Sequence, residues 1–319
     1  MKSRGNAHSR NGDIDVAIVG AGASGLYAAW RLARETKLRV QLFELDAMRV
    51  GGRMYTTIPE NMPTMRAELG AMRFSPTQEL LAGLIQELGL ATMPFSGNEL
   101  LGVYLRARRL PGEACAARTY AHVPSSAPLP YNLRDDEKGK SAPELLVNAM
   151  FQAVPGAAAD IPPRQLFDLL SKAEVPAEGG RPLHESGFWN LLMRSLSDEA
   201  YQFVFDSFGI ESALSNWNSM AALFTFKLLL PALQGGDKQF RTLADGFSQL
   251  AHELKRGFED EGGEVLLGHR LLACARSYRG DGPGVELTFQ NEATGERSVL
   301  HAHQAILAMP ARALELLDS

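Results

Sequence analysis

The chain has 319 residues, of which 45% are hydrophobic and 22% charged, and its formal net charge is −5 at pH 7. This composition is typical of a soluble globular protein with a sizeable core, and the length predicts one large domain or two interlocked ones. The negative balance argues against nucleic acid or an anionic membrane surface as a partner.

Residues 1–13 are polar and lack the apolar stretch of a secretory signal, so we expect a disordered tail. The most apolar later stretch, residues 220–233, is interrupted by a lysine and a proline and predicts a buried helix rather than a membrane span. Cys115 and Cys274 stand in unrelated contexts and predict neither a disulfide framework nor a zinc site. These features favour a cytoplasmic protein.

A glycine-rich turn follows the first apolar run. Residues 15–19 (DVAIV) are typical of a buried parallel strand, and they lead directly into GAGASG and a helix over 26–34. In this strand–turn–helix context Gly20 permits the tight turn, and Gly22 lets the backbone approach a pyrophosphate. Gly25 lets the helix pack closely on the strand. The sequence therefore predicts a dinucleotide-binding turn.

Two further features fit the same unit. Ala23 and Ser24 open the helix, whose N-terminus offers free N–H groups and a partial positive charge to a phosphate. The next strand, residues 38–43, ends in Glu44, where an acid can accept hydrogen bonds from ribose hydroxyls. The alternative for Glu44 is a surface glutamate that closes a strand. These residues alone leave NAD and FAD both open.

The following motif separates the two cofactors. Residues 44–53 (ELDAMRVGGR) resemble the acid-then-GGR signature of the flavin-dependent amine oxidase family, which implies FAD. Gly51 and Gly52 would let backbone approach the ligand, and Arg53 would add a fixed positive charge near the diphosphate. The resemblance also implies that Leu45 contacts the cofactor.

A second segment carries the resemblance further. Residues 67–74 (AELGAMRF) resemble the segment that runs past the flavin in L-amino-acid oxidases and tryptophan 2-monooxygenases. The resemblance places Gly70, Ala71 and Met72 beside the ribityl chain and ring. It implies that Arg73 contacts the cofactor and also grips the substrate α-carboxylate, which a guanidinium can bind bidentately. Arg73 could instead pair with a structural carboxylate.

The middle of the chain is predicted to be mainly helical. Residues 75–78 (SPTQ) predict a helix start with a capping box, and Gly89 can end that helix. Apolar side chains recur between them at helical spacing and predict a core-facing stripe: Leu80, Leu81, Leu84, Ile85 and Leu88. Residues 135–142, 187–190 and 215–218 resemble landmarks of the same oxidases, and we expect Trp189 and Trp217 to pack in a core.

The last third of the chain is expected to return to the cofactor domain. Residues 240–251 resemble the glycine-then-helix entry to the second flavin-domain segment, where the backbone of Val265 would meet the adenine. Residues 299–310 read as a strand. In this fold a late segment of the chain returns to the sheet begun at residues 15–19, and we expect that segment to be missing here. We expect a second polypeptide from the same precursor to complete the protein, and the assembly to form a homo-oligomer.

These expectations define an α/β fold in which a Rossmann-like FAD-binding domain is interleaved with a substrate-binding domain and a helical region. Residues 14–74 form the first FAD-binding segment, 75–235 the helical and substrate region, and 236–319 the second FAD-binding segment, running into the substrate domain.

The resemblance implies FAD-dependent oxidation of an L-amino acid by dioxygen, giving a 2-oxo acid, ammonia and hydrogen peroxide. One alternative is decarboxylating monooxygenation to an amide, and another is a flavin-family fragment that binds without catalysis. The sequence identifies no acid–base residue and no cluster of metal ligands.

Overall fold

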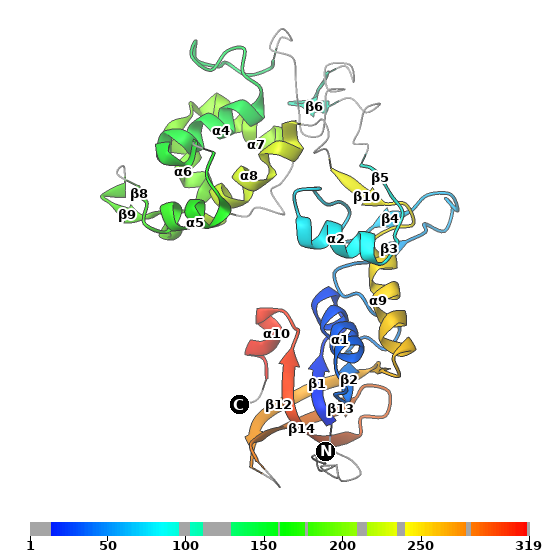
Figure 1. Ribbon diagram of the computed structural model, residues 1–319. Helices are drawn as coiled ribbons and strands as arrows, with labels where there is room; N and C mark the ends of the chain where they lie inside the picture. The colour runs from blue at the N-terminus through cyan, green and yellow to red at the C-terminus, as the bar shows by residue number, and fades with distance from the viewer. Residues whose placement is uncertain are drawn as a thin grey trace, which may run out of the picture. The chain divides into compact units, whose positions relative to one another are not determined.

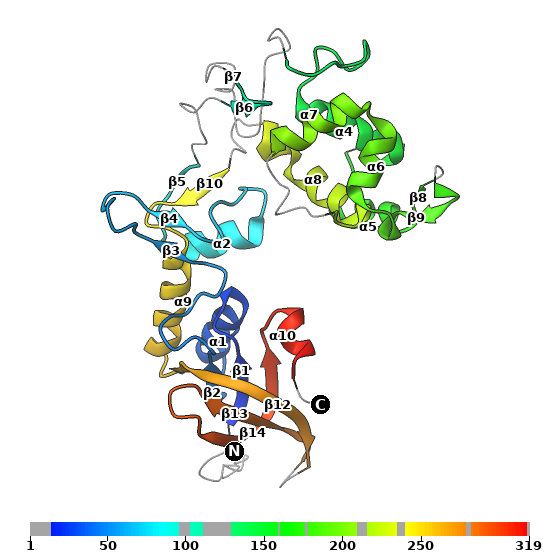
Figure 2. The same ribbon diagram turned by 180° about the vertical axis from the view of Figure 1, so that it is seen from behind.

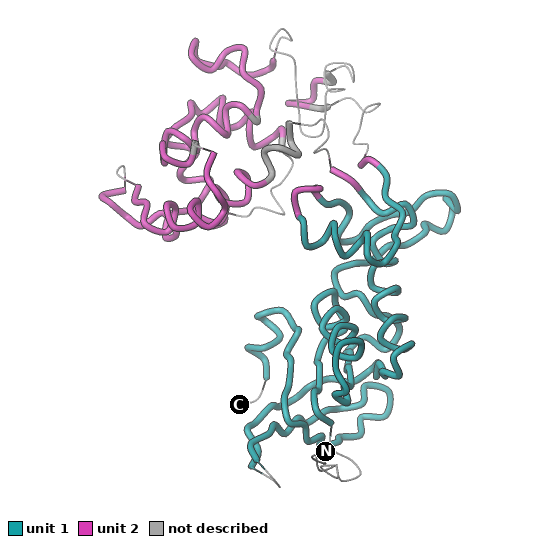
Figure 3. The backbone as a smooth tube through the Cα atoms, in the orientation of Figure 1, with its two compact units in different colours: residues 1–74, 79–93, 242–319 teal, residues 75–78, 94–241 magenta. Residues whose placement is uncertain are grey.

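The computed structural model describes residues 14–95, 103–110, 129–158, 160–175, 178–208, 216–234, 240–278 and 282–317. The expected tail, Cys115 and the last two residues lie outside these ranges. Two compact units are present (Figure 3): unit 1 comprises residues 1–74, 79–93 and 242–319, and unit 2 comprises residues 75–78 and 94–241. Unit 1 is thus assembled from segments that are far apart in the sequence.

Within the described residues, unit 1 is built on a six-stranded sheet with the order β11-β2-β1-β14-β13-β12 (Figure 1). Its strands are β1 (Ile14–Val19), β2 (Val40–Phe43), β11 (Glu264–Leu266), β12 (His269–Ser277), β13 (Gly284–Asn291) and β14 (Arg297–Leu307). The pairs of β1 with β2, β2 with β11 and β1 with β14 are parallel, whereas β12, β13 and β14 form an antiparallel meander.

Strand β14 belongs to both parts of this sheet. Its residues 297–302 pair antiparallel with β13, and residues 302–307 pair parallel with β1, in a register that joins Ile14 to Ala302 and Val19 to Leu307. A late return of the chain to the first strand is therefore present, and the expectation that it would be missing is wrong. The sequence shows one strand at 299–310 but gives no sign that this strand changes partner midway.

Alternate residues of β1 point to opposite faces of the sheet, and each face has its own core. Val16 and Ile18 pack with the helices α1 (Ala23–Glu35) and α9 (Ser248–Asp260), which lie side by side in Figures 1 and 2. On the other face Ala17 and Val19 belong to a cluster in which Phe43 stacks on Phe289, with ring centroids 4.2 Å apart. Burial on both faces explains why β1 is a continuous apolar run.

Unit 1 also holds a small hairpin of β3 (Thr56–Thr57) and β4 (Ala67–Glu68), and a helix α2 (Glu79–Glu87). The short strand β5 (Thr92–Pro94) pairs with β10 (Arg241–Leu243), and α10 (Ala311–Glu315) follows β14.

Helix α2 begins at Glu79, later than the start predicted at residues 75–78. Those four residues form a turn in which the Ser75 N–H donates to Gln78 Oε1 at 2.8 Å, as the predicted capping box requires. Ile85 is buried as expected, but Leu80 is 93% exposed because it falls at the margin of the stripe in the first turn. The predicted end is confirmed: Gly89 has a φ of +66°, and the Leu90 N–H donates to the Ile85 carbonyl at 3.0 Å.

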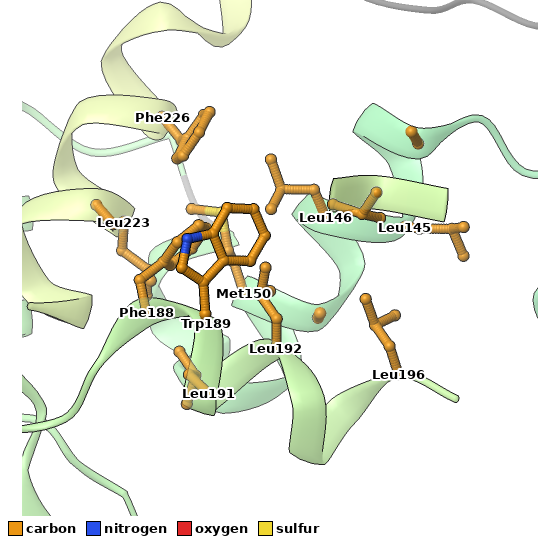
Figure 4. Close-up of a cluster of buried hydrophobic side chains, with 14 of the residues drawn as sticks. Leu145, Leu146, Met150, Phe188, Trp189, Leu191, Leu192, Leu196, Leu223 and Phe226 are labelled. Carbon is orange, nitrogen blue, oxygen red and sulfur yellow. The ribbon is translucent and has the colours of Figure 1, made fainter. Parts of the chain in front are cut away.

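The helices of unit 2 enclose one large apolar cluster (Figure 4). Among the described residues they are α4 (Ala142–Ala153), α5 (Pro163–Ser171), α6 (Phe188–Ser195), α7 (Asp198–Phe208) and α8 (Ser219–Gln234), with 3-10 turns at Pro155–Ala158 and Leu183–Glu185. The described part of the unit also contains two hairpins: β6 (Val103–Leu105) with β7 (Arg108–Leu110), and β8 (Glu174–Val175) with β9 (Arg181–Pro182).

Two expectations about unit 2 are met. Trp189 is 8% exposed and lies in the cluster, against which Trp217 also packs. The apolar stretch at 220–233 is helix α8, which buries Ala222, Leu223 and Phe226. Among the described residues, no helix is long and apolar enough to cross a membrane.

A carboxylate is buried beside the apolar cluster of unit 2. The side chain of Glu137 is 3% exposed and accepts hydrogen bonds from the Ser197 N–H at 2.8 Å and the Arg134 guanidinium at 2.7 Å. Burial alone would raise the pKa of Glu137, but the hydrogen bonds from Ser197 and Arg134 outweigh it, so the pKa lies below its ordinary value. The ionised carboxylate therefore links the start of α7 to the turn before α4.

Candidate functional site

The glycine turn after β1 has the geometry that its sequence predicts. Gly20 has a φ of +102°, and its N–H donates to the Phe43 carbonyl at 2.7 Å. A Cβ added to Gly20 would lie 2.7 Å from the Ala308 carbonyl oxygen, and one added to Gly25 would lie 1.9 Å from the Gly20 carbonyl oxygen. Neither position can hold a side chain, because a backbone atom already occupies the space.

The second glycine leaves open space in front of α1. A Cβ on Gly22 would meet nothing within 4 Å, and Gly22 is the N-cap of a helix with no side-chain cap and no acidic residue in its first turn. The first backbone bond of α1 runs from the Leu26 N–H to the Gly22 carbonyl, at 3.0 Å. Ala23 and Ser24 are exposed at this N-terminus. A helix start of this kind can bind an anion through its N–H groups.

A second glycine pair lies against this turn. Gly51 forms a parallel bridge with Gly22, and its N–H donates to the Ala21 carbonyl at 2.7 Å. Gly51 and Gly52 both have positive φ, +105° and +55°, and a Cβ on Gly52 would sit 3.5 Å from the Gly22 Cα. Arg53 follows directly and is exposed. The structure thus brings the predicted Gly52 and Arg53 beside the glycine turn.

Sequence reasoning missed Arg49, which holds this pair of glycines in place. Its Nη1 donates to the Gly52 carbonyl at 2.9 Å, and its guanidinium lies over the Tyr55 ring, 4.5 Å from the centroid. Asp46 forms an ion pair with the same guanidinium, with Oδ2 3.3 Å from Nε. Nothing in the local spacing distinguishes Arg49 from any other surface arginine.

Glu44 has a structural contact in addition to its predicted role. Its Oε2 accepts from the Ala21 N–H at 2.6 Å, and its Oε1 accepts from the Asp46 N–H at 2.9 Å. An ionised carboxylate has about four acceptor positions, so positions remain for the two hydroxyls of a ribose. Leu45, the next residue, is 46% exposed.

Val265 lies on the edge strand of the described sheet. In β11 the Leu266 carbonyl accepts from the Glu44 N–H at 2.8 Å, so the peptide groups of Leu266 face β2. Neighbouring residues of a strand direct their peptide groups to opposite sides, so those of Val265 face the open edge. A planar base with adjacent donor and acceptor atoms could pair with them.

The segment Gly70–Arg73 runs along the backbone of Arg53. The Ala71 N–H donates to the Arg53 carbonyl at 3.0 Å, and a Cβ on Gly70 would lie 1.9 Å from that same carbonyl oxygen. Met72 is 44% exposed and Arg73 is half-buried. Gly70 therefore has to be glycine for the two segments to touch.

These residues form a path with polar features at defined positions: a carboxylate, an uncapped helix start, and a strip of close-approaching backbone. The path fits an elongated dinucleotide, with a ribose at Glu44, a diphosphate at α1 and a further ring system near Gly70. In the described part of the chain, no three His, Cys, Asp or Glu side chains are grouped in a way that could hold a metal ion.

Comparison with known proteins supports the same interpretation. Residues 23–319 match the family model described as "Flavin containing amine oxidoreductase". The chain is 28% identical over 315 residues to achacin of Lissachatina fulica, covering 96% of this chain and 55% of that protein. It is 42% identical over 96 residues to tryptophan 2-monooxygenase of Allorhizobium ampelinum, covering 29% of this chain and 13% of that protein.

Aplysianin-A of Aplysia kurodai is 29% identical over 322 residues, with 96% of this chain and 54% of that protein covered. The chain thus spans about half the length of achacin and aplysianin-A. Among solved structures, putrescine oxidase bound to putrescine matches at a TM-score of 0.60 with 21% identity, and cyclohexylamine oxidase from Brevibacterium oxydans at 0.62 with 19%. Both matches cover 96% of this chain and 60% of the other, and they confirm the α/β fold.

Proposed function

The chain belongs to the flavin containing amine oxidoreductase family, and on that premise we propose that it is the FAD-binding part of an L-amino-acid oxidase. The overall reaction consumes an L-amino acid, dioxygen and water, and yields a 2-oxo acid, ammonia and hydrogen peroxide. The observation that carries the proposal is the contact between the Arg53 backbone and the Gly70–Ala71 segment. Through it, one continuous backbone surface leads from the dinucleotide turn to Arg73.

In this proposal the residues of the chain bind FAD and fix its orientation. The N-terminus of α1, with Ala23 and Ser24, holds the diphosphate, and Arg53 adds positive charge there. Glu44 accepts from the ribose hydroxyls, and Val265 meets the adenine through its backbone. The flavin, when bound, supplies the electron-accepting chemistry of the reaction.

Arg73 binds the α-carboxylate of the substrate in this proposal. It stands three residues after Gly70, so the guanidinium and the flavin-facing backbone belong to one short segment. A guanidinium stays charged and binds a carboxylate with two parallel hydrogen bonds, which fixes the orientation of the amino acid as well as its affinity. Correct orientation of the Cα–H bond is the main contribution that this segment makes to the rate.

Replacement of Arg73 by lysine tests this role. We expect the KM for amino acids to rise about 10- to 100-fold, because a point charge loses one of two charge-assisted hydrogen bonds. FAD affinity should be unchanged. Arg66→Lys is the matched control, since Arg66 forms an exposed ion pair with Asp245 at 2.8 Å in the same unit. Oxidation of amino-acid amides as fast as the acids would contradict the role.

The second candidate is a decarboxylating 2-monooxygenase. Its support is the 42% identity to tryptophan 2-monooxygenase over 96 residues. Product analysis separates the two activities, because the oxidase releases ammonia and peroxide whereas the monooxygenase releases carbon dioxide and an amide. A chain that binds flavin but yields neither set of products would be the non-catalytic fragment.

The cofactor assignment has its own test, which is purification of the natural protein. We expect FAD to remain bound, with the flavin absorbance visible. A colourless preparation that cannot be reconstituted with FAD would refute the flavin site itself.

A further inference from the structure

The start of helix α9 is capped by side chains from a different element. Its N-cap residue Phe247 makes no side-chain cap, and its first turn carries no acidic residue. The Phe247 N–H donates instead to Glu68 Oε1 at 2.9 Å, and the Ser248 N–H donates to Thr56 Oγ1 at 2.9 Å. Both acceptors belong to the β3–β4 hairpin, which lies by the start of α9 in Figure 1. Two N–H groups that a helix start leaves open are thus satisfied from outside the helix.

The four residues form a closed set of hydrogen bonds. Thr56 Oγ1 donates to Glu68 Oε2 at 2.8 Å, and the Thr56 N–H donates to Ser248 Oγ at 2.8 Å. Gly246 makes this approach possible, because it has a φ of +88° and a Cβ there would lie 2.3 Å from Thr56 Cγ2. The carboxylate of Glu68 also lies at the start of α9, where the free N–H groups of a helix can bind an acceptor.

Thr56 and Glu68, which belong to this set of hydrogen bonds, are adjacent in sequence to residues 53–55 and 69–71 of the candidate flavin site. Glu68 pairs with Thr56 in the β3–β4 register, and the Leu69 N–H continues the pairing by donating to the Tyr55 carbonyl at 2.8 Å. The Ala71 N–H then reaches the Arg53 carbonyl. Any rotation of the hairpin against α9 would therefore move residues 53–55 and 69–71 together.

We propose that Glu68 is a positioning residue for FAD: by joining the β3–β4 hairpin to the start of α9, it sets where Gly70 and Ala71 lie against the cofactor. The inference rests on the proposed flavin site. Glu68 touches neither substrate nor flavin in this assignment, and its effect passes through the backbone of the two residues that follow it.

The test measures FAD binding by the natural protein after its flavin has been removed. The dissociation constant of FAD is read from the quenching of flavin fluorescence, and the visible circular dichroism of the bound flavin reports its surroundings. We expect Glu68→Ala to raise the dissociation constant about 10- to 100-fold, which is the loss of one or two charge-assisted hydrogen bonds. Glu68→Gln should stay within about threefold of the wild type, because the amide can accept from Phe247 and donate to Thr56.

Asp15→Ala is the matched control. Asp15 Oδ2 also accepts one backbone N–H, from Arg39 at 2.7 Å, but it lies at the opposite end of the parallel strands from the glycine turn. This variant should lose thermal stability while its FAD dissociation constant and flavin dichroism stay at the wild-type values. If Glu68→Ala does not fold, Thr56→Val removes the hydroxyl that joins Glu68 to Ser248 and should change both readouts in the same direction.

The outcomes distinguish the proposed function from the positioning role of Glu68. A wild-type protein that binds no FAD refutes the proposed function, whatever Glu68 does. A folded Glu68→Ala or Thr56→Val variant with wild-type affinity and dichroism overturns the positioning role while the flavin site stands. Equal losses in Glu68→Gln and Glu68→Ala also overturn it, because a residue that acts by position is rescued by an amide of the same shape.

Discussion

The two units of this chain depend on their sequences in different ways. In unit 1 the decisive positions are those where atoms must be absent, as at Gly25 and Gly70, where a Cβ would lie 1.9 Å from a carbonyl oxygen. In unit 2 the decisive quantity is the volume of packed apolar side chains, with aromatic contacts such as the stacked rings of Phe188 and Phe226, 5.6 Å apart. Unit 1 is thus specified by residue identity at single positions, and unit 2 by pattern and volume.

The largest expected effect is that of a single methyl group in unit 1. Gly25→Ala should lower the free energy of unfolding by more than about 4 kcal/mol, because the new atom meets backbone that cannot move aside. Binding of FAD should be lost with it. Denaturant unfolding and flavin titration measure both quantities.

The control is another glycine of the same unit. Gly83 lies inside α2, and a Cβ there would meet nothing within 4 Å. Gly83→Ala should stabilise the protein by about 0.5–1 kcal/mol through helix propensity alone. If the two variants behaved alike, close packing at the glycine turn would not be the reason for Gly25.

A smaller effect is expected from a buried carboxylate of unit 2. Glu137→Ala should lower the free energy of unfolding by about 3 kcal/mol, because the Arg134 guanidinium and the Ser197 N–H lose a buried ionised partner. The folded-state pKa of Glu137 is depressed below its ordinary value of 4.5, so its contribution is complete above that pH and is lost as the pH falls through the folded-state pKa.

The pH dependence gives a second way to check this contribution. Wild-type stability should fall more steeply than that of Glu137→Ala as the pH drops below 4.5. Parallel pH profiles of the two proteins, measured by thermal unfolding, would show that Glu137 carries no such charge-dependent stability.

The smallest effect is expected inside the apolar cluster itself. Leu192 is fully buried. Leu192→Met should nevertheless lower the free energy of unfolding by less than about 1.5 kcal/mol, because the side-chain volume is conserved and methionine adapts its shape. Leu192→Ala should cost about 2–5 kcal/mol, since it leaves a cavity. A large loss in the methionine variant, measured by denaturant unfolding, would mean that unit 2 is as exacting as the glycine turn.

The same contrast explains what the sequence could predict. The turn at Gly20, Gly22 and Gly25 was readable because each glycine answers a local steric demand that recurs in every such turn. Trp189 was correctly expected in a core, since large apolar side chains at helical spacing have few other places to go. The family assignment followed from the same short motifs.

Features that depend on distant partners were not readable. Phe247 and Glu68 are 179 positions apart, and neither residue type nor spacing announces their hydrogen bond. Leu80 was expected in the core because helical spacing of apolar residues does not show at which turn the buried stripe of α2 begins. The partner change of β14 was missed for a related reason, since its two pairings involve β1 and β13, which are remote from each other in sequence.

Strand β14 has a consequence for how the protein folds. Ile14 pairs with Ala302, so β1 keeps one edge without its final partner until β14 has been synthesised. Contacts of such long sequence separation close slowly, because the entropy of the intervening chain is lost before the pairing compensates for it. The apolar edge of β1 is meanwhile open to other strands. Folding of unit 1 should therefore be limited by the arrival of a single late strand.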